Sequence, residues 1–182
     1  MASSTEPRLN LPTIRPGTRL DRVDAAITTT LARIGIPVLR IGLGIVFLWF
    51  GFLKFFPGLS PAQDLAERTI HDLTFGIVGP SVSLPVLAAW ESLIGIGLIA
   101  GRFLRAMLFL LAVQMIGTFL PLVFYPSETF TQFPYAPTLE GQYIIKNLVL
   151  IGAAIVVGST VRGGRIVPDA GLREPQTTDR GA

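Results

Sequence analysis

The sequence contains no cysteine and a single histidine among its 182 residues. Without cysteine, the chain forms no disulfide and offers no thiolate to an iron–sulfur cluster or a haem. His71 alone is too little for bis-histidine haem ligation within one chain, and no second histidine or cysteine accompanies it as a metal ligand. We therefore expect no metal site and no covalent cofactor, and we interpret His71 as a solvent-exposed residue.

Charged residues are also scarce. They make up 15% of the chain, against about a quarter in soluble domains, whereas 50% of the residues are hydrophobic. This composition argues against an ordinary soluble enzyme and predicts a chain that lies largely in a lipid bilayer.

Four long apolar runs account for the hydrophobicity, and they cover residues 36–56, 84–100, 103–124 and 143–161. Each run is long enough to cross the bilayer core as a helix. Only Gly101 and Arg102 separate the second run from the third, so these two helices must form an antiparallel hairpin. The sequence predicts an all-α integral membrane protein, a four-helix bundle within residues 21–161.

The segments outside the spans differ in composition. Residues 1–20 and 162–182 are polar and rich in arginine and proline, which predicts a disordered basic tail and a flexible C-terminal tail. Residues 21–35 carry apolar side chains at helical spacing and predict a short interfacial helix. Ser60 to Gln63 has the form of a capping box ahead of an amphipathic pattern, so a second short helix is expected outside the membrane.

Basic residues are distributed unevenly between the two sides of the predicted bundle. Twelve arginines lie on the side of the termini and of the short turn at Gly101, whereas Lys54, Arg68 and Lys146 lie near the other side. The positive-inside rule then predicts that both termini are cytoplasmic. The same distribution explains the formal net charge of +3 without a nucleic-acid partner.

One stripe of the first span carries, at steps of three and four residues, Arg40, Gly44, Phe47, Gly51 and Lys54. Its two glycines would let a neighbouring helix approach closely, and they also offer a seam between copies in a homo-oligomer. The two cations have two interpretations. They either snorkel to opposite membrane interfaces or contribute to a polar site.

Glu91 lies near the middle of the shortest predicted span. A charge at this depth costs about 2.5–3.5 kcal/mol on insertion scales, so the carboxylate must be paired, protonated or in contact with water. A buried ion pair that fixes helix register and a functional acid are both open interpretations. Because the spans alternate in direction, Lys54 and Lys146 are expected at similar depth, with Glu91 within reach of either.

These residues predict a polar pocket that opens outward. Its polar lining would consist of Lys54, Glu91, Lys146, Asn147 and Gln114, and its aromatic walls would include Trp49 and Trp90. The carboxylate would transfer a proton, the lysines would bind an anionic oxygen, and the aromatic rings would stack on a flat ligand. Quinone or quinol headgroups meet these requirements, as do other ligands. Gln114 also suits plain hydrogen bonding between helices.

The pattern resembles the DoxX-like family of small four-span membrane proteins, including its YkgB-like branch. The resemblance covers residues 37–161 and rests on Arg40 to Gly44, Phe47 to Gly51 with Lys54, Glu91 with Gly95, and the pair Lys146 and Asn147. It implies a four-helix bundle in a prokaryotic inner membrane and an association with redox or oxidative-stress physiology. Relatives include the large subunit of a thiosulfate:quinone oxidoreductase, although this chain has no thiol chemistry of its own.

Two functions follow from these observations. The first is a quinone-interacting membrane subunit of an oxidoreductase system, with Glu91 as the catalytic acid and Lys54, Lys146 and Asn147 as ligand-binding residues. The second is a non-enzymatic assembly factor or accessory partner of another membrane complex, in which the polar residues only fix helix register. A redox role would require another membrane or redox protein or a diffusing quinone, because the chain has no group that carries electrons alone. Whether the chain is itself an enzyme stays open.

Overall fold

The structure is a computed structural model that describes residues 19–56 and 58–164. Most of the two predicted tails, residues 1–18 and 165–182, lies outside the described residues. The described residues divide into two compact units, with the boundary between Gly35 and Ile36.

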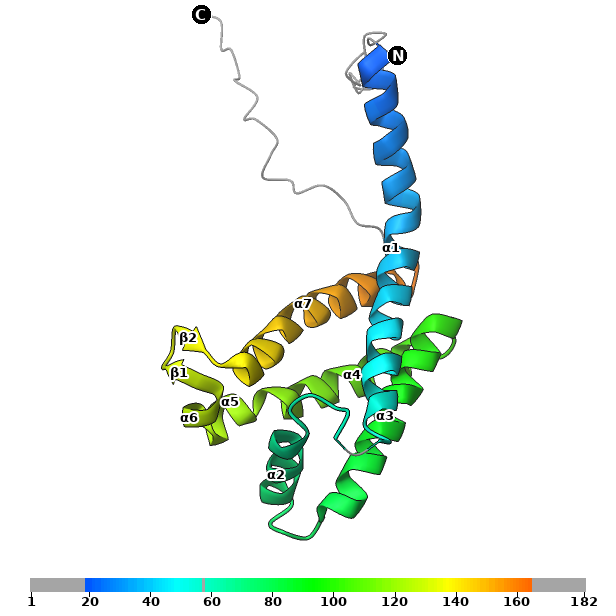
Figure 1. Cartoon of the computed structure of the whole chain (residues 1–182). Helices are drawn as coiled ribbons and strands as arrows, with labels where there is room; N and C mark the ends of the chain where they lie inside the picture. Colours follow the sequence, from blue (N-terminus) through cyan, green and yellow to red (C-terminus); the bar gives the residue numbers. More distant parts are fainter. Residues whose placement is uncertain (1–18, 57, 165–182) are drawn as a thin grey trace, which may run out of the picture. The chain divides into compact units, whose positions relative to one another are not determined.

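Within the described residues, four helical segments are long and apolar enough to cross a membrane. They are α1 (Arg19–Leu53), α3 (Pro80–Ala100), α4 (Leu104–Phe119) together with the short α5 (Pro121–Phe124), and α7 (Leu139–Thr160) (Figure 1). The prediction of a helical protein with four spans is therefore confirmed. The largest shifts of a boundary inside the second unit are of four residues: α3 begins at Pro80 rather than at residue 84, and α7 begins at Leu139 rather than at residue 143.

The first unit contributes the N-terminal part of α1. Its described residues 19–35 are helical, and the apolar side chains of Val23, Ile27 and Leu31 are exposed. The prediction of a separate short helix over residues 21–35 is corrected, because α1 extends from Arg19 to Leu53. Pro37 lies inside this helix. A proline removes one backbone N–H donor, and membrane helices tolerate this because neighbouring groups satisfy the freed carbonyl.

In the second unit, four helices share one hydrophobic core. Helix α4 packs against both α3 and α7 (Figure 1). The centre of the core consists of Ile94 and Leu98 of α3 and Leu111 of α4, and α1 adds Leu43 and Phe47. These side chains are buried on all sides, whereas the outer faces of the same helices expose apolar residues, as expected for helices surrounded by lipid.

The close approach of α1 to α3 depends on glycines in both helices. A Cβ atom added at Gly51 would lie 2.7 Å from Glu91 Cβ, and one added at Gly44 would lie 2.9 Å from the carbonyl oxygen of Gly95. A Cβ atom at Gly95 would collide with the backbone of Leu48. The predicted stripe is thus a packing seam within the chain. Its interpretation as a seam between copies is corrected, because α3 already occupies it.

Arg40 lies at the end of this seam and caps α3. Its guanidinium donates hydrogen bonds to the carbonyl oxygens of Leu98 and, at 3.2 Å, Ile99. The last carbonyls of a helix have no partner within the helix and carry partial negative charge, so a cation from the neighbouring helix stabilises them. Arg40 therefore has a structural role in the fold.

The connection after α1 contains α2 (Gln63–Leu73), the amphipathic helix predicted from the sequence. It buries Leu65 and Thr69 and packs against α3 and α5. The predicted capping box is wrong, since the residue that precedes the helix is Ala62, with a φ of 53° and no side-chain cap. The Gln63 Oε1 atom instead accepts a hydrogen bond of 3.0 Å from the backbone N–H of Gly58.

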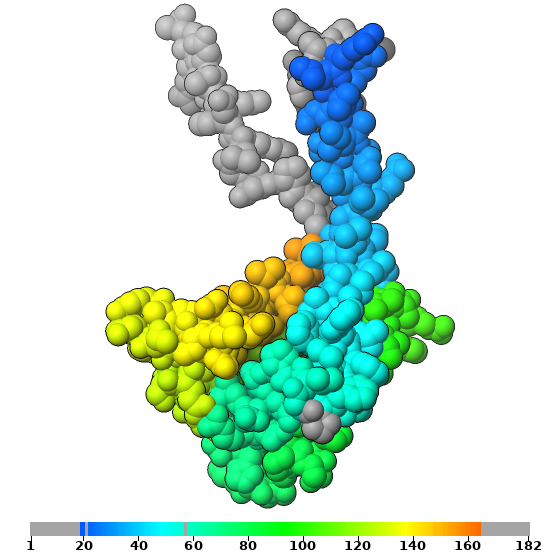
Figure 2. Space-filling model, viewed as in Figure 1, coloured from blue at the N-terminus to red at the C-terminus, as the bar shows by residue number. Residues whose placement is uncertain are grey.

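The connection before α7 contains further regular structure. Helix α6 (Pro126–Thr129) leads into a small antiparallel hairpin of β1 (Phe130–Gln132) and β2 (Ala136–Pro137). Figure 2 shows the surface of α2 next to that of this segment. The two connections therefore lie together on one side of the second unit.

Candidate functional site

The central polar site joins three helical regions of the second unit. Lys54, which follows the last residue of α1, donates from Nζ to Glu91 Oε2 of α3 at 2.7 Å. Gln114 of α4 donates from Nε2 to the other carboxylate oxygen, Oε1, at 2.5 Å. The side chains of Lys54 and Glu91 are only 13% and 10% exposed. We call Lys54, Glu91 and Gln114 the Glu91 cluster.

The glycine seam places the cluster. Gly51 lies one turn before Lys54, and its missing side chain leaves room for Glu91 Cβ. A larger residue at Gly51 would push α1 away from α3 and lengthen the ion pair. Lys54 also donates to the carbonyl oxygen of Phe50 at 3.3 Å, which fixes the direction of its side chain. The sequence therefore positions the cation through local helix geometry and a close helix contact.

Two buried polar atoms in and next to the cluster have unused hydrogen-bonding capacity. Among the described residues, Ser92 Oγ and Gln114 Oε1 are buried and have no hydrogen-bond partner. Gln114 contacts the Glu91 carboxylate directly, whereas the side chain of Ser92, the next residue of α3, points to a different face of the helix. A buried polar atom without a partner costs about 1–3 kcal/mol, so the free Gln114 Oε1 atom at this acid calls for an explanation.

Two predicted pocket residues lie apart from this cluster. Lys146 of α7 is exposed, with Nζ 5.7 Å from the centroid of the Tyr143 ring. Asn147 donates from Nδ2 to the carbonyl oxygen of Tyr143 at 3.2 Å. No hydrogen bond or ion pair among the described residues joins either side chain to Glu91. The structure thus brings together Lys54, Glu91 and Gln114 and does not add Lys146 or Asn147 to them.

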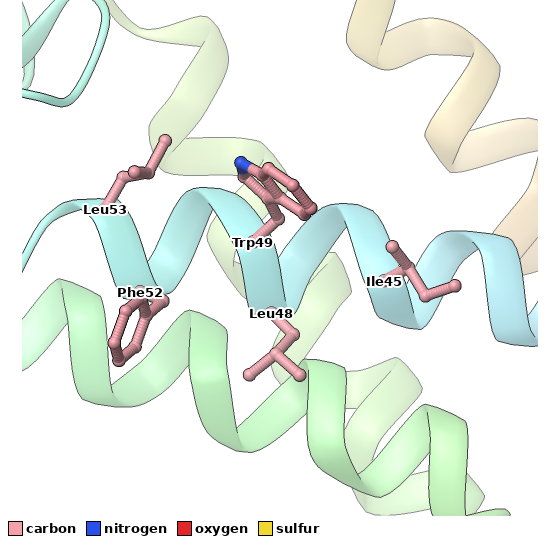
Figure 3. A pocket seen from close by; sticks show the side chains of 5 residues that line it. All are labelled: Ile45, Leu48, Trp49, Phe52 and Leu53. Carbon is pink, nitrogen blue, oxygen red and sulfur yellow. The ribbon is translucent and has the colours of Figure 1, made fainter.

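The two predicted aromatic walls have different surroundings. Trp49 is 65% exposed and lines an apolar hollow of about 470 Å³ on α1, together with Ile45, Leu48, Phe52 and Leu53 (Figure 3). Trp90 is half-buried, and its indole N–H donates to the carbonyl oxygen of Leu110 at 3.3 Å. Trp90 therefore helps to hold α3 against α4, while Trp49 belongs to a surface that faces away from the core.

A second polar cluster, which the sequence analysis missed, joins the two connections. The guanidinium of Arg68 on α2 donates to Glu128 Oε1 at 2.8 Å and to Glu128 Oε2 at 2.5 Å. It also lies 5.2 Å from the centroid of the Tyr125 ring, and the Tyr125 hydroxyl donates to Asp72 Oδ2 at 2.5 Å. We call Arg68, Asp72, Tyr125 and Glu128 the outer cluster.

These contacts shift the pKa values of the exposed groups. The hydrogen bond from Arg68 lowers the pKa of the Glu128 carboxyl below its ordinary value, and the hydrogen bond from Tyr125 lowers that of Asp72. The same contact with Asp72 raises the pKa of the Tyr125 hydroxyl. The outer cluster is thus held by charge-assisted hydrogen bonds that neutral pH favours.

His71 lies beside the outer cluster, with Nδ1 3.4 Å from Asp72 Oδ1. Its side chain is 51% exposed, which confirms the prediction of a solvent-exposed residue. Within residues 19–56 and 58–164, no group of three histidine, cysteine or acidic residues is arranged to hold a metal ion.

Comparison with known families adds to this geometry. A sequence model of the DoxX family matches residues 35–126. The chain belongs to the DoxX family. The matched region of this DoxX protein contains the whole Glu91 cluster and ends before α7, so it does not include Lys146 and Asn147. No curated protein and no solved structure matches the chain. Its assignment to the YkgB-like branch stays a prediction.

Family and fold agree on the environment of the protein. The helices that can cross a membrane and the family match identify this DoxX protein as a multi-pass membrane protein. Its surroundings are therefore a lipid bilayer, in which the buried charges of the Glu91 cluster are energetically expensive.

Proposed function

We propose that this DoxX protein is a quinone-interacting membrane subunit of a redox system in a prokaryotic inner membrane, with Glu91 as the proton-transferring acid. The observation that carries the proposal is the Glu91 cluster: an acid buried among three helical regions, paired with a lysine and bonded to Gln114, whose amide oxygen is buried without a partner among the described residues. Intramembrane ionisable residues of this kind commonly belong to proton or ligand pathways.

The unpartnered amide oxygen beside Glu91 suits the reduced form of a quinone headgroup. Gln114 Oε1 would accept a hydrogen bond from a quinol hydroxyl, next to the carboxylate that would exchange its proton. The apolar hollow on α1 ends at Leu53, directly before Lys54, and suits an apolar tail. A bound quinone supplies coupled electron and proton transfer, chemistry that the side chains of this chain do not provide.

In this proposal, the three residues of the Glu91 cluster have different roles. Lys54 stabilises the ionised carboxylate and orients it, because it donates to one of its oxygens. Glu91 binds or releases the proton, and Gln114 keeps the second carboxylate oxygen in place. Electrons would come from, or go to, another membrane or redox protein.

A second function has its own supporting observation. Both charges of the Lys54 and Glu91 pair are satisfied within the chain, as in a buried pair that fixes helix register. In that case the protein is a non-enzymatic assembly factor or accessory partner of a membrane complex. The exposed Trp49 and its apolar hollow would then contact the partner rather than a ligand tail.

Mass spectrometry of small molecules that co-purify with the protein in native-lipid nanodiscs separates the two functions. Wild type, Glu91→Gln and the matched control Glu140→Gln are compared, the control removing an exposed acid from the first turn of α7. We expect wild type and the control to retain a quinone and Glu91→Gln to lose it. Because this substitution leaves Lys54 without its counter-charge, its melting temperature should fall, so the comparison is made at a temperature at which circular dichroism shows the variant to be folded. No quinone on wild type, with a membrane complex co-purifying instead, would overturn the redox proposal and support the accessory role.

A further inference from the structure

Lys146 of α7 is a lysine that the Glu91 cluster does not use. Its side chain is exposed, and within the described residues it takes part in no ion pair. Its ammonium instead faces the Tyr143 ring at 5.7 Å from the centroid. A lysine near the end of a membrane helix extends its charge toward the lipid headgroups, where anions are available.

An apolar groove lies farther along α7, toward its C-terminal end. It encloses about 340 Å³ between α4 and α7, and its lining includes Phe119 of α4 and Ile151, Ala154 and Gly158 of α7. Asn147 lies one helical turn before Ile151, on the same stripe of α7. Tyr143 lies one further turn back on this stripe, and the Lys146 ammonium faces its ring, although the Lys146 backbone belongs to a neighbouring stripe. Tyr143 and Asn147 therefore mark one end of the apolar groove, and the Lys146 ammonium lies beside Tyr143.

The dimensions match one leaflet of a bilayer. The twelve residue steps from Lys146 to Gly158 correspond to about 18 Å along the helix axis. One leaflet contributes about half of the hydrocarbon core, roughly 15 Å. A molecule with an anionic headgroup at Lys146 would thus place its hydrocarbon chain along the groove.

We propose that Lys146 and the groove between α4 and α7 bind an anionic phospholipid, with the phosphate on the Lys146 ammonium and an acyl chain in the groove. The fixed negative charge favours a phospholipid over a quinone, whose ring is uncharged. This inference does not depend on the proposed redox function.

Native mass spectrometry of the protein titrated in detergent tests the proposal. The probes are phosphatidylglycerol and phosphatidylcholine with identical acyl chains, so that only the headgroup charge differs. Wild type should prefer phosphatidylglycerol, and Lys146→Gln should weaken its binding roughly fivefold, the effect of one cation near an anionic headgroup. Lys146→Arg should keep the preference. Arg105→Gln, which removes an exposed cation at the start of α4, is the matched control.

The groove is tested separately from the charge. Ala154→Phe should fill the groove and weaken the binding of both lipids, whereas Val149→Phe, at a residue that is 75% exposed and outside the groove, should not. Glycerol phosphate in excess should not displace the lipid. Equal binding of the two lipids to wild type, full binding to Lys146→Gln, or displacement by glycerol phosphate would overturn the proposal. So would displacement by ubiquinone or a dimer that excludes lipid.

Discussion

The two ion pairs of this DoxX protein have the same chemistry in opposite surroundings. The side chains of Lys54 and Glu91 are 13% and 10% exposed, whereas those of Arg68 and Glu128 are 49% and 42% exposed. Water can replace either partner of the exposed pair, so its loss costs little. The buried pair has no such substitute, because removal of one partner leaves a charge in a poorly polar environment. Stability therefore depends strongly on the pairing of Glu91 and only weakly on that of Glu128.

The two pairs also differ in what they hold together. Lys54 and Glu91 connect the end of α1 to the middle of α3, directly over the glycine seam. Arg68 and Glu128 connect α2 to α6 outside the predicted spans. The first pair sets the distance between two membrane helices, and the second ties two connections to each other.

The largest effect is expected from Lys54→Met, which leaves Glu91 buried without its cation. The free energy of unfolding should fall by about 3–5 kcal/mol, as for other buried pairs that lose one partner. Thermal unfolding in detergent, followed by helical circular dichroism, measures the loss. The double variant Lys54→Met with Glu91→Met should recover most of the stability, since no charge stays buried. A double variant as unstable as Lys54→Met alone would contradict this account.

The next effect is expected at the glycine seam beneath the buried pair. Gly51→Ala should destabilise the protein by about 1–3 kcal/mol, because the new Cβ atom meets the backbone and side chain of Glu91. Gly42→Ala is the matched control on the same helix, since a Cβ atom there meets nothing within 4 Å. The melting temperatures of the two variants provide the comparison. An equal change of melting temperature in the two variants would show that the substitutions act through helix propensity and not through close packing of α1 against α3.

The smallest effect is expected from Arg68→Gln in the outer cluster. Its melting temperature should change less than that of Gly51→Ala, and added salt should reduce the difference from wild type further. Salt should leave the effect of Lys54→Met nearly unchanged, because the buried pair is poorly screened. A large fall of the melting temperature in Arg68→Gln that added salt does not reduce would contradict the contrast between the two ion pairs.

The outer cluster should also respond to pH. The pKa values of Glu128 and Asp72 are lowered in the folded chain, so their contribution to stability is complete at neutral pH. It is lost as the pH falls through these lowered values, below the ordinary values of 4.5 and 3.8. The raised pKa of Tyr125 has the opposite sign, and its contribution is lost as the pH rises past 10.0. Melting curves of wild type and Glu128→Gln between these limits should converge in acid.

Local patterns explain what the sequence predicted correctly. The four spans follow from long apolar runs, and a cation at Glu91 follows from the cost of an isolated charge in lipid, although the sequence left open whether Lys54 or Lys146 supplies it. Gly44 and Gly51 predicted a close helix contact because they lie on one stripe of the first span and have no side chain. These features depend on residues within one helix or on two neighbouring spans.

Contacts between distant segments explain what the sequence did not predict. Arg68 and Glu128 are 60 residues apart, and nothing in either segment indicates the other. Lys146 and Asn147 were placed in the pocket by depth alone, but the rotation of α7 about its axis leaves Lys146 exposed and bonds Asn147 to its own helix. The start of α2 depends on the left-handed backbone at Ala62, which residue preferences disfavour. The position of a residue along its span therefore predicts its depth in the membrane more reliably than it predicts which side chains it contacts.

Infrared difference spectroscopy tests most directly whether Glu91 transfers protons. The protein in nanodiscs is loaded with quinone and with quinol in turn, and the carboxyl stretching region of the two spectra is compared. The account predicts a carboxyl protonation change that is present in wild type and in Glu140→Gln and absent in Glu91→Gln. A spectrum without a carboxyl change, or a change that persists in Glu91→Gln, would contradict it.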